Sequence, residues 1–235
     1  MIIVGCCGWG YLRIPQDSKK NYKSVLSYYA SLFELVEVNS TFYSVPRIST
    51  AKRWREEVSA NFIFTVKASR IITHIDRFSS EKSLELVSFY IEFSRELLAP
   101  ILLFQLPSTF PRKNIDDLVK ILQTFRDSPV KFAVEARNLD IYERDEFAKA
   151  TDTIPVIDPF TVLDTNFKPN PIMDTFYFRL HGMPPGRVMY RYDYTDGDLE
   201  RLLFYLEPIK DYNVYVLFNN TEMYKNALRF KEMIS

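Results

Sequence analysis

Ionisable and amide side chains recur along this chain, each directly after a short apolar run. The runs are rich in β-branched and aromatic residues, which is typical of buried strands. A single polar residue at such a place is most often a loop hydrogen-bonder, but recurrence after seven runs indicates a shared site. The residues concerned are Glu37 and Asn39, Lys67, Gln105, Glu135 and Arg137, Asp158, Arg179 and His181, Asn219 and Asn220, with Tyr43 and His74 a few residues beyond two of the runs.

The set combines groups for proton transfer with groups for anion binding. Carboxylates accept protons and histidine transfers them near neutral pH, which predicts catalytic roles for Glu135 as general base, His181 as general acid and Glu37 as an orienting residue. Lysine and arginine hold carboxylates and phosphates. The predicted substrate-binding residues are Lys67, Arg137, Arg179, Gln105, Asn39, Tyr43, His74, Asp158, Asn219 and Asn220.

A structural interpretation of the same charges stays open. Glu135 and Arg137 lie two residues apart on one run, so their side chains share a face, and the same holds for Arg179 and His181. Opposite charges on shared faces can form an ion-pair lattice inside a protein without any catalysis.

Metal chemistry is less favoured. Glu37, Glu135, Asp158 and His181 could supply ligands to a divalent ion. However, the lysine and two arginines of the same set would crowd such a site with positive charge. We therefore predict no metal site and no cofactor, with a divalent metal as the alternative.

The apolar runs alternate with longer segments of helical period, which predicts parallel strands joined by right-handed crossovers. No Gly-x-Gly-x-x-Gly motif follows the first run, which disfavours a dinucleotide-binding sheet. We expect a (β/α)8 TIM barrel of eight parallel strands, forming a single domain over residues 1–235. The expected strands are 2–5, 35–38, 61–66, 101–104, 132–134, 154–157, 176–180 and 214–218; the expected helices are 22–33, 49–58, 80–98, 114–125, 142–150, 195–206 and 221–233, and 159–175 lacks a clear helix.

Helix-capping residues mark several of these boundaries. Ser49, Asn114, Thr195 and Thr221 are each expected to cap the helix that follows. Trp54 is expected to face inward.

Composition limits the classes of function. Thirty Lys and Arg balance thirty Asp and Glu, which does not indicate a nucleic-acid-coating or membrane-surface protein, although nucleic acid stays possible as a partner. No run of 18 apolar residues and no secretory leader is visible, so we expect a cytoplasmic protein without membrane association. Cys6 and Cys7 are adjacent and are expected to be reduced, with Cys7 an inert packing residue rather than a nucleophile.

Seven short motifs, spread in order along the chain, are together typical of one known family. They are Gly5 with Gly8-Trp9, Val36 to Tyr43, Phe64 to Ser69 with Thr73-His74, Phe104 to Pro107, Val134 to Arg137, Arg179 to Gly182 and Phe218 to Asn220. Through them the chain resembles the domain-of-unknown-function 72 family, also called YecE-like, along nearly its whole length. The resemblance implies a TIM barrel but no activity, because the family has no settled one. Two departures are visible: Asn138-Leu139-Asp140 stands where the family commonly has His-Ser/Thr-Trp, and Thr221 stands where an Asp commonly follows the paired asparagines.

Three functions are compatible with these residues. The first is an enzyme, a hydrolase or a lyase, that acts on a small polar or anionic molecule through acid and base residues. The second, by fold analogy alone, is a metal-dependent nuclease or DNA-repair barrel. The third is a non-catalytic protein that binds a small anion or a nucleotide.

Overall fold

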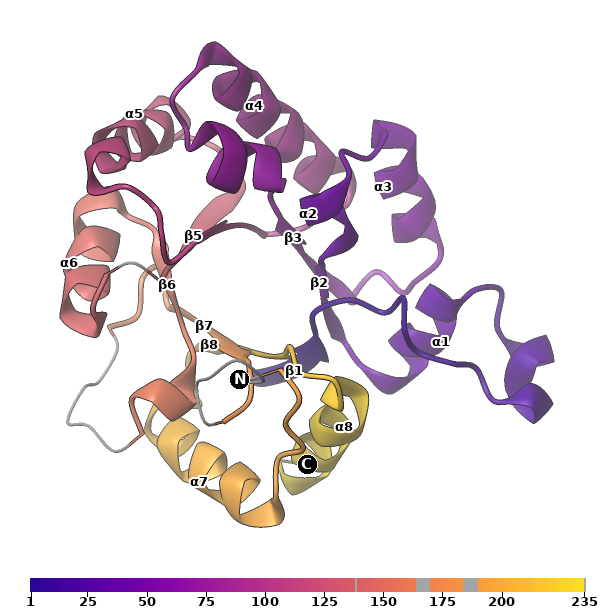
Figure 1. The fold of residues 1–235 in the computed structure, drawn as a ribbon. Coiled ribbons are helices and arrows are strands. Elements are labelled where there is room, and N and C mark those ends of the chain that lie inside the picture. The colour runs from indigo at the N-terminus through magenta and orange to yellow at the C-terminus, as the bar shows by residue number, and fades with distance from the viewer. Residues whose placement is uncertain (138, 164–169, 184–189, 235) are drawn as a thin grey trace. The chain divides into compact units, whose positions relative to one another are not determined.

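A computed structural model describes residues 1–137, 139–163, 170–183 and 190–234 of the chain. Its strands are parallel neighbours in chain order, and β1 pairs with β8, so the sheet closes into a barrel (Figure 1). The predicted (β/α)8 barrel of eight parallel strands is therefore confirmed. The strands are β1 (Ile2–Cys6), β2 (Leu35–Val38), β3 (Ile63–Lys67), β4 (Ile101–Leu106), β5 (Lys131–Ala136), β6 (Ile154–Ile157), β7 (Thr175–Leu180) and β8 (Asn213–Phe218).

Helices alternate with these strands. Residues 164–169, which belong to the stretch predicted to lack a clear helix, lie outside the described part of the chain. The α-helices are α1 (Val25–Leu32), α2 (Ser40–Tyr43), α3 (Ile48–Glu56), α4 (Glu81–Glu96), α5 (Ile115–Thr124), α6 (Ile141–Thr151), α7 (Asp196–Leu206) and α8 (Met223–Met233); the shorter turns are η1 (Gln16–Asn21), η2 (Ile71–Asp76), η3 (Arg112–Asn114), η4 (Pro159–Thr161) and η5 (Glu207–Ile209).

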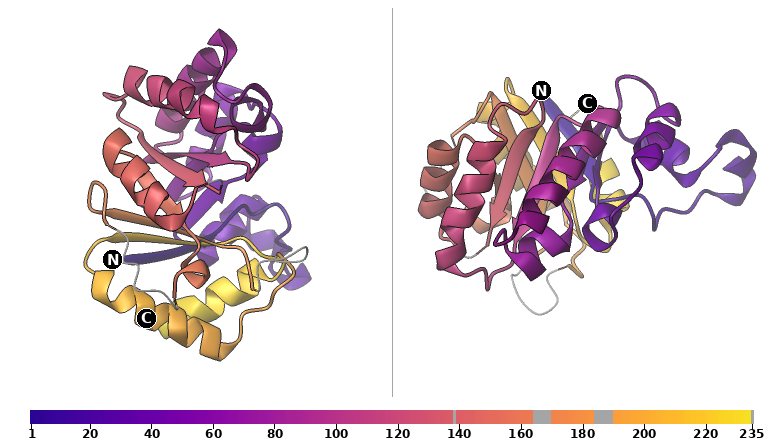
Figure 2. Two further views of the ribbon diagram at one scale, coloured as in Figure 1. Left: turned by 60° about the vertical axis from the view of Figure 1, so that its left-hand side comes forward. Right: turned by 90° about the horizontal axis from the view of Figure 1, so that it is seen from above.

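The chain forms two compact units. Unit 1 comprises Met1–Glu37 and Val156–Ser235, and unit 2 comprises Val38–Pro155. In unit 1, α8 packs against β1 and β8, and in unit 2, α4 packs against β3 and β4 (Figure 2). The predicted single domain over residues 1–235 stays a prediction.

Buried strands explain the apolar runs of the sequence. All residues of β2, β6 and β7 are buried, as expected for strands covered on both faces. In unit 1, Gly5 of β1 pairs with Leu35 of β2, and a Cβ at Gly5 would collide with the Leu35 carbonyl oxygen. Glycine is therefore required for the close approach of these two strands.

One predicted helix cap is confirmed. The Thr195 side chain accepts a hydrogen bond from the Asp198 N–H at 3.2 Å, and the Asp198 carboxylate accepts one from the Thr195 N–H at 2.8 Å. This reciprocal capping box satisfies two donors that the first turn of α7 would otherwise leave unpaired.

Two of the other predicted caps are wrong, and the third is confirmed in position only. Ser49 lies inside the first turn of α3, because Arg47 is the extended residue before that helix. Thr221 lies two residues before α8, and its N–H donates instead to the Tyr190 carbonyl oxygen at 2.7 Å. Asn114 does precede α5, but its side chain makes no cap and donates to the Arg77 carbonyl oxygen at 3.3 Å.

Other local features bear on the remaining predictions. Trp54 is half-buried, with its ring 6.1 Å from that of Phe93 on α4. Among the described residues, no helix is both long and apolar enough to cross a membrane.

Candidate functional site

Polar side chains lie near the carboxyl ends of otherwise apolar strands. Glu37, Lys67, Glu135 and Arg179 are each no more than 5% exposed, and Gln105 is half-buried. The predicted position near strand ends is therefore confirmed for these five residues. Glu37 and Arg179 belong to unit 1 and the others to unit 2, and each group is described below by itself. The prediction that all of them line one pocket stays a prediction.

In unit 1, Glu37 and Arg179 form a fully buried ion pair. The Arg179 guanidinium donates to Glu37 Oε1 at 2.9 Å, and neither side chain has any exposed surface. The Tyr177 hydroxyl donates to Glu37 Oε2 at 2.9 Å, and Cys7 Sγ lies 3.7 Å from the Arg179 guanidinium. Each charge neutralises the other inside the protein, where an unpaired charge would be very costly. The predicted roles of Glu37 in catalysis and Arg179 in substrate binding stay predictions.

Also in unit 1, His181 follows β7 and is held from three sides. Its backbone N–H donates to Asp158 Oδ2 at 3.0 Å, and its ring packs edge-on against Tyr190 at 5.6 Å. Asn219 Nδ2 lies 3.1 Å from His181 Nδ1. An amide NH2 group only donates, so Nδ1 accepts, and the neutral ring then carries its proton on Nε2. Three predicted site residues, Asp158, His181 and Asn219, therefore lie together.

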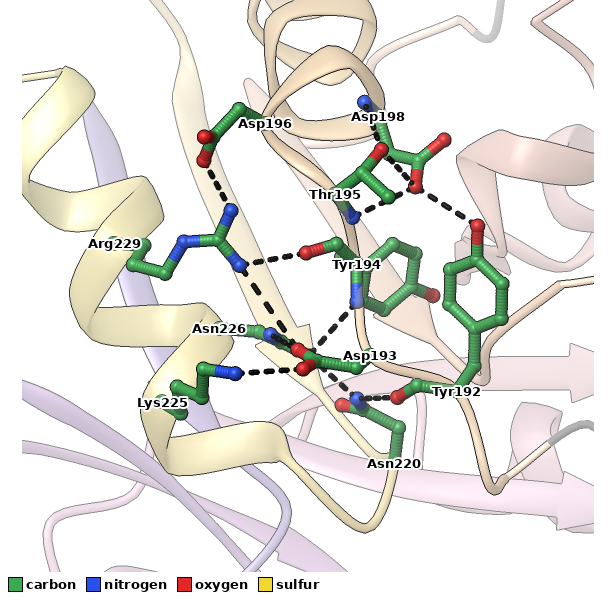
Figure 3. A network of polar contacts seen from close by, with 10 residues as sticks. All are labelled: Tyr192, Asp193, Tyr194, Thr195, Asp196, Asp198, Asn220, Lys225, Asn226 and Arg229. Carbon is green, nitrogen blue, oxygen red and sulfur yellow. Dashed lines mark hydrogen bonds and ion pairs between the residues drawn. The ribbon is translucent and has the colours of Figure 1, made fainter.

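Asn220, by contrast, links two structural elements. Its Nδ2 donates to the Tyr192 carbonyl oxygen at 2.6 Å and to Asn226 Oδ1 at 2.7 Å. Asn226 donates in turn to Asp193 at 2.6 Å, so the segment before α7 is fastened to α8. The predicted role of Asn220 in substrate binding stays a prediction. Figure 3 shows the network, which comprises Tyr192, Asp193, Tyr194, Thr195, Asp196, Asp198, Asn220, Lys225, Asn226 and Arg229.

In unit 2, Lys67 ends β3 over an aromatic ring. Its Nζ lies 3.9 Å from the centroid of the Phe42 ring, a cation–π contact. The short helix α2, which carries Phe42, is fixed to β3 because the Thr41 hydroxyl donates to the Lys67 carbonyl oxygen at 2.7 Å. Lys67 is 5% exposed, so its ammonium group is held in place rather than extended into solvent.

Near the same strand end, His74 lies on the turn η2. Its Nδ1 is 2.8 Å from the Thr73 hydroxyl, and its ring packs edge-on against Phe42 at 5.1 Å. The predicted site residues Lys67 and His74 therefore both contact the ring of Phe42.

The charges around His74 are mostly positive. Burial, and then the positive charges of Lys67, Arg70, Arg137 and Arg77, lower the pKa of His74 from its ordinary value. The ring is therefore neutral at pH 7. Lys67, which ends β3, and Arg137, which follows β5, thus both act on His74.

Glu135 is a buried carboxylate that pairs with Arg137, one of the cations acting on His74. It lies in β5 opposite Gln105 of β4, is 4% exposed, and accepts a hydrogen bond from Arg137 Nε at 2.5 Å. The charges of Glu135 and Asp140 raise the pKa of Arg144, whereas burial, the largest effect, and Arg137 lower it. The predicted pair of Glu135 and Arg137 is therefore present, in the geometry that a general base or a structural ion pair would use.

The remaining predicted residues, Asn39 and Tyr43, lie near the start of unit 2 in the sequence. Asn39 precedes α2 and is half-buried, and Tyr43 is 74% exposed, with its ring 5.1 Å from that of Phe42. Their predicted contacts with a substrate stay predictions.

Sequence reasoning missed several residues of these clusters. Phe42 and Tyr177 are aromatic residues in apolar surroundings, which are usually core residues. Arg70 and Arg77 flank His74 in the connection after β3, and their place after a strand end was the available signal. Nothing in the local pattern indicates that their charges act on His74.

Two further features concern metal and thiol chemistry. Within residues 1–137, 139–163, 170–183 and 190–234, no three His, Cys, Asp or Glu side chains gather closely enough to hold a metal ion. Cys6 and Cys7 are both buried, and burial raises the pKa of the Cys6 thiol well above its ordinary value. A deeply buried thiol of this kind is unreactive.

Comparison with known proteins agrees with the family resemblance. Residues 3–235 match the family described as "Protein of unknown function DUF72". The UPF0759 protein YunF of Bacillus subtilis is 26% identical, across 100% of this chain and 94% of its own. A DUF72 family protein from Thermotoga maritima has a crystal structure that matches at TM-score 0.74 and 26% identity, covering 100% of this chain and 99% of that one. A D-psicose 3-epimerase from Clostridium cellulolyticum shares the fold at TM-score 0.58 and 13% identity, with 96% and 89% of the two chains covered.

Proposed function

This chain belongs to the DUF72 family of proteins of unknown function, and we propose that it is an enzyme, a hydrolase or a lyase, acting on a small anionic substrate. The observation that carries this proposal is the buried carboxylate of Glu135 in unit 2, which pairs with Arg137, one of the cations whose charges act on His74. Strand ends are where barrel enzymes keep their catalytic groups.

Glu135 has the surroundings of a general base. Its carboxylate is kept from water and is oriented by Arg137, whose Nε lies 2.5 Å away. A carboxylate that is poorly solvated and held in one geometry can take a proton without first losing a hydration shell. In a lyase it would take the proton from carbon, and in a hydrolase from the attacking water.

Lys67 and Arg137 have the surroundings of anion-binding groups. Both charges act on His74, so an anion near that ring would feel both. Lys67 is held against the Phe42 ring at 3.9 Å, and a cation fixed beforehand loses little side-chain entropy when a ligand binds. The substrate would thus be held by the cations and transformed by Glu135.

Turnover in matched glutamate variants tests this proposal. Anionic metabolites are screened by thermal shift, since a ligand that binds the folded state raises the unfolding temperature, and each stabilising compound is then assayed for conversion. Glu135→Gln should lower kcat by about 10²- to 10⁴-fold, the usual contribution of a general base. The control Glu146→Gln alters an exposed residue of α6 and should leave kcat unchanged. Wild-type turnover by Glu135→Gln would refute the proposal.

A further inference from the structure

The connection between β3 and α4 has an unusual backbone. It contains η2, a π-helical turn, which is a rare element often found at functional sites. Arg77 and Phe78, the two residues after η2, have left-handed φ angles of 54° and 64°. Neither is glycine, so this conformation is strained and persists only because the surroundings hold it. The amide of Asn114 supplies one such restraint, since it donates to the Arg77 carbonyl oxygen at 3.3 Å.

This strained connection carries two arginines, Arg70 and Arg77, without an acceptor among the described residues. Within the described part of the chain, neither Arg70 nor Arg77 has an ion pair or a side-chain hydrogen bond, and Arg77 Nε is itself buried without a partner. Asp76, the neighbouring carboxylate, is occupied at the start of α4, where it accepts hydrogen bonds from Ser80 N–H and from the Ser83 hydroxyl. A buried donor without an acceptor is costly, so its retention points to an acceptor that comes from a ligand.

His74 lies between these arginines in the sequence and is affected by both charges. Its Nδ1 contacts the Thr73 hydroxyl at 2.8 Å, and among described residues Nε2 has no hydrogen-bond partner. With the Thr73 hydroxyl donating to Nδ1, the neutral ring carries its proton on Nε2. The ring is then a donor to an anion, and because it is neutral it does not repel the nearby cations.

We infer that the β3–α4 connection is the subsite for a phosphoryl group, bound by the guanidinium groups of Arg70 and Arg77 and by His74 Nε2. Two guanidinium forks and a ring N–H match the three terminal oxygens of a phosphate monoester. The charge also matches, because a phosphoryl group carries about −1.5 to −2 at neutral pH. A lone carboxylate would balance only one of the two charges of Arg70 and Arg77. The inference rests on the proposed function in naming this phosphoryl group as part of the substrate of Glu135.

The two histidines of the chain allow a direct test by NMR. Inorganic phosphate is titrated into the full-length protein at pH 7 and constant ionic strength, and the Hε1 signals are assigned with His74→Gln and His181→Gln. The His74 signal should shift and saturate, whereas the His181 signal should not. Sulfate should compete with phosphate, and acetate should compete far more weakly.

Arginine variants locate the site. Arg77→Gln keeps the Cβ and backbone of Arg77 and should weaken phosphate binding at least tenfold, and Arg77→Lys should recover part of the loss. The matched control is Arg126→Gln, which removes an exposed arginine between α5 and β5 and should leave binding unchanged. Each variant is first checked for a wild-type unfolding temperature, and Arg70→Gln, at an exposed residue, replaces Arg77→Gln if that variant does not fold.

Three results would overturn the phosphoryl subsite. These are a His74 signal that does not respond to phosphate, an equal response to chloride, and undiminished binding by Arg77→Gln together with Arg70→Gln. Failure of the proposed function is a separate result, because Glu135→Gln with wild-type turnover refutes the role of Glu135 even where phosphate binds at His74.

Discussion

Removal of one partner from the buried Glu37–Arg179 pair should strongly destabilise the protein. In unit 1 the Glu37 carboxylate has no exposed surface and contacts the Arg179 guanidinium and the Tyr177 hydroxyl. Arg179→Met removes the first of these contacts and keeps the second. Breaking a buried pair by removing one partner typically costs about 3–5 kcal/mol. For a chain of this length each kcal/mol lowers Tm by about 2–4 °C, so Arg179→Met should unfold about 6–20 °C below the wild type.

Urea denaturation followed by circular dichroism measures this cost. The double variant Glu37→Leu/Arg179→Met replaces the pair by apolar side chains and should recover much of the lost stability, since buried pairs are often no better than apolar residues of similar volume. Recovery should be incomplete, because the Tyr177 hydroxyl then loses its acceptor, a cost of about 1–3 kcal/mol. Adding Tyr177→Phe should remove that remaining cost.

The exposed pair of Lys225 and Asp193 is the matched control in the same unit. Their side chains are 57% and 46% exposed, and exposed pairs contribute about 0–1 kcal/mol. Lys225→Met should therefore change stability little. If Arg179→Met were as stable as Lys225→Met, the buried pair would not hold unit 1 together, and the interpretation of Arg179 as the partner of Glu37 would be wrong.

Three further predictions concern single residues. The pKa of His74 in the folded protein lies below its ordinary value of 6.5, so the unfolded chain binds a proton at a higher pH than the folded protein does. The free energy of unfolding should therefore fall as the pH is lowered from 7 through 6.5 and below, and urea melts of His74→Gln should lack this contribution to the pH dependence. Gly5→Ala should lower Tm measurably, because its Cβ would collide with the Leu35 carbonyl oxygen, and an unchanged Tm would show that β1 and β2 can separate without cost. Asn219→Ala removes the donor to His181 Nδ1, so ¹⁵N NMR should show the ring changing from the Nε2–H tautomer to a mixture; an unaltered spectrum would mean that Asn219 does not select the tautomer.

The barrel could be predicted from the sequence because strand and helix patterns alternate in a strict order. The ranges 35–38 and 154–157 match β2 and β6, whose residues are all buried. Other strands run one or two residues beyond the predicted ends, as β5 does from Lys131 to Ala136. These ends depend on pairing with a neighbouring strand, which a local apolar pattern does not contain.

The site could be predicted only in part. That polar residues lie near strand ends follows from the sequence, as does the pair of Glu135 and Arg137 on one strand, but pairs between distant segments do not. Glu37 and Arg179 are 142 positions apart, and their contact depends on the barrel rather than on any local spacing. The π-helical η2 was missed because a single π-turn has no periodic signature. The role of Arg70 and Arg77 around His74 was therefore not predicted.

The most direct test of the proposed function compares the affinity of one anionic ligand for two variants by calorimetry. In the proposed function the cations bind the anion and Glu135 transfers the proton. Lys67→Met should then weaken binding by about tenfold or more, as expected for the loss of a charge-assisted contact of about 1.5–3 kcal/mol. Glu135→Gln should bind the same ligand within a few-fold of the wild type. Undiminished binding by Lys67→Met together with lost binding by Glu135→Gln would contradict this division of roles.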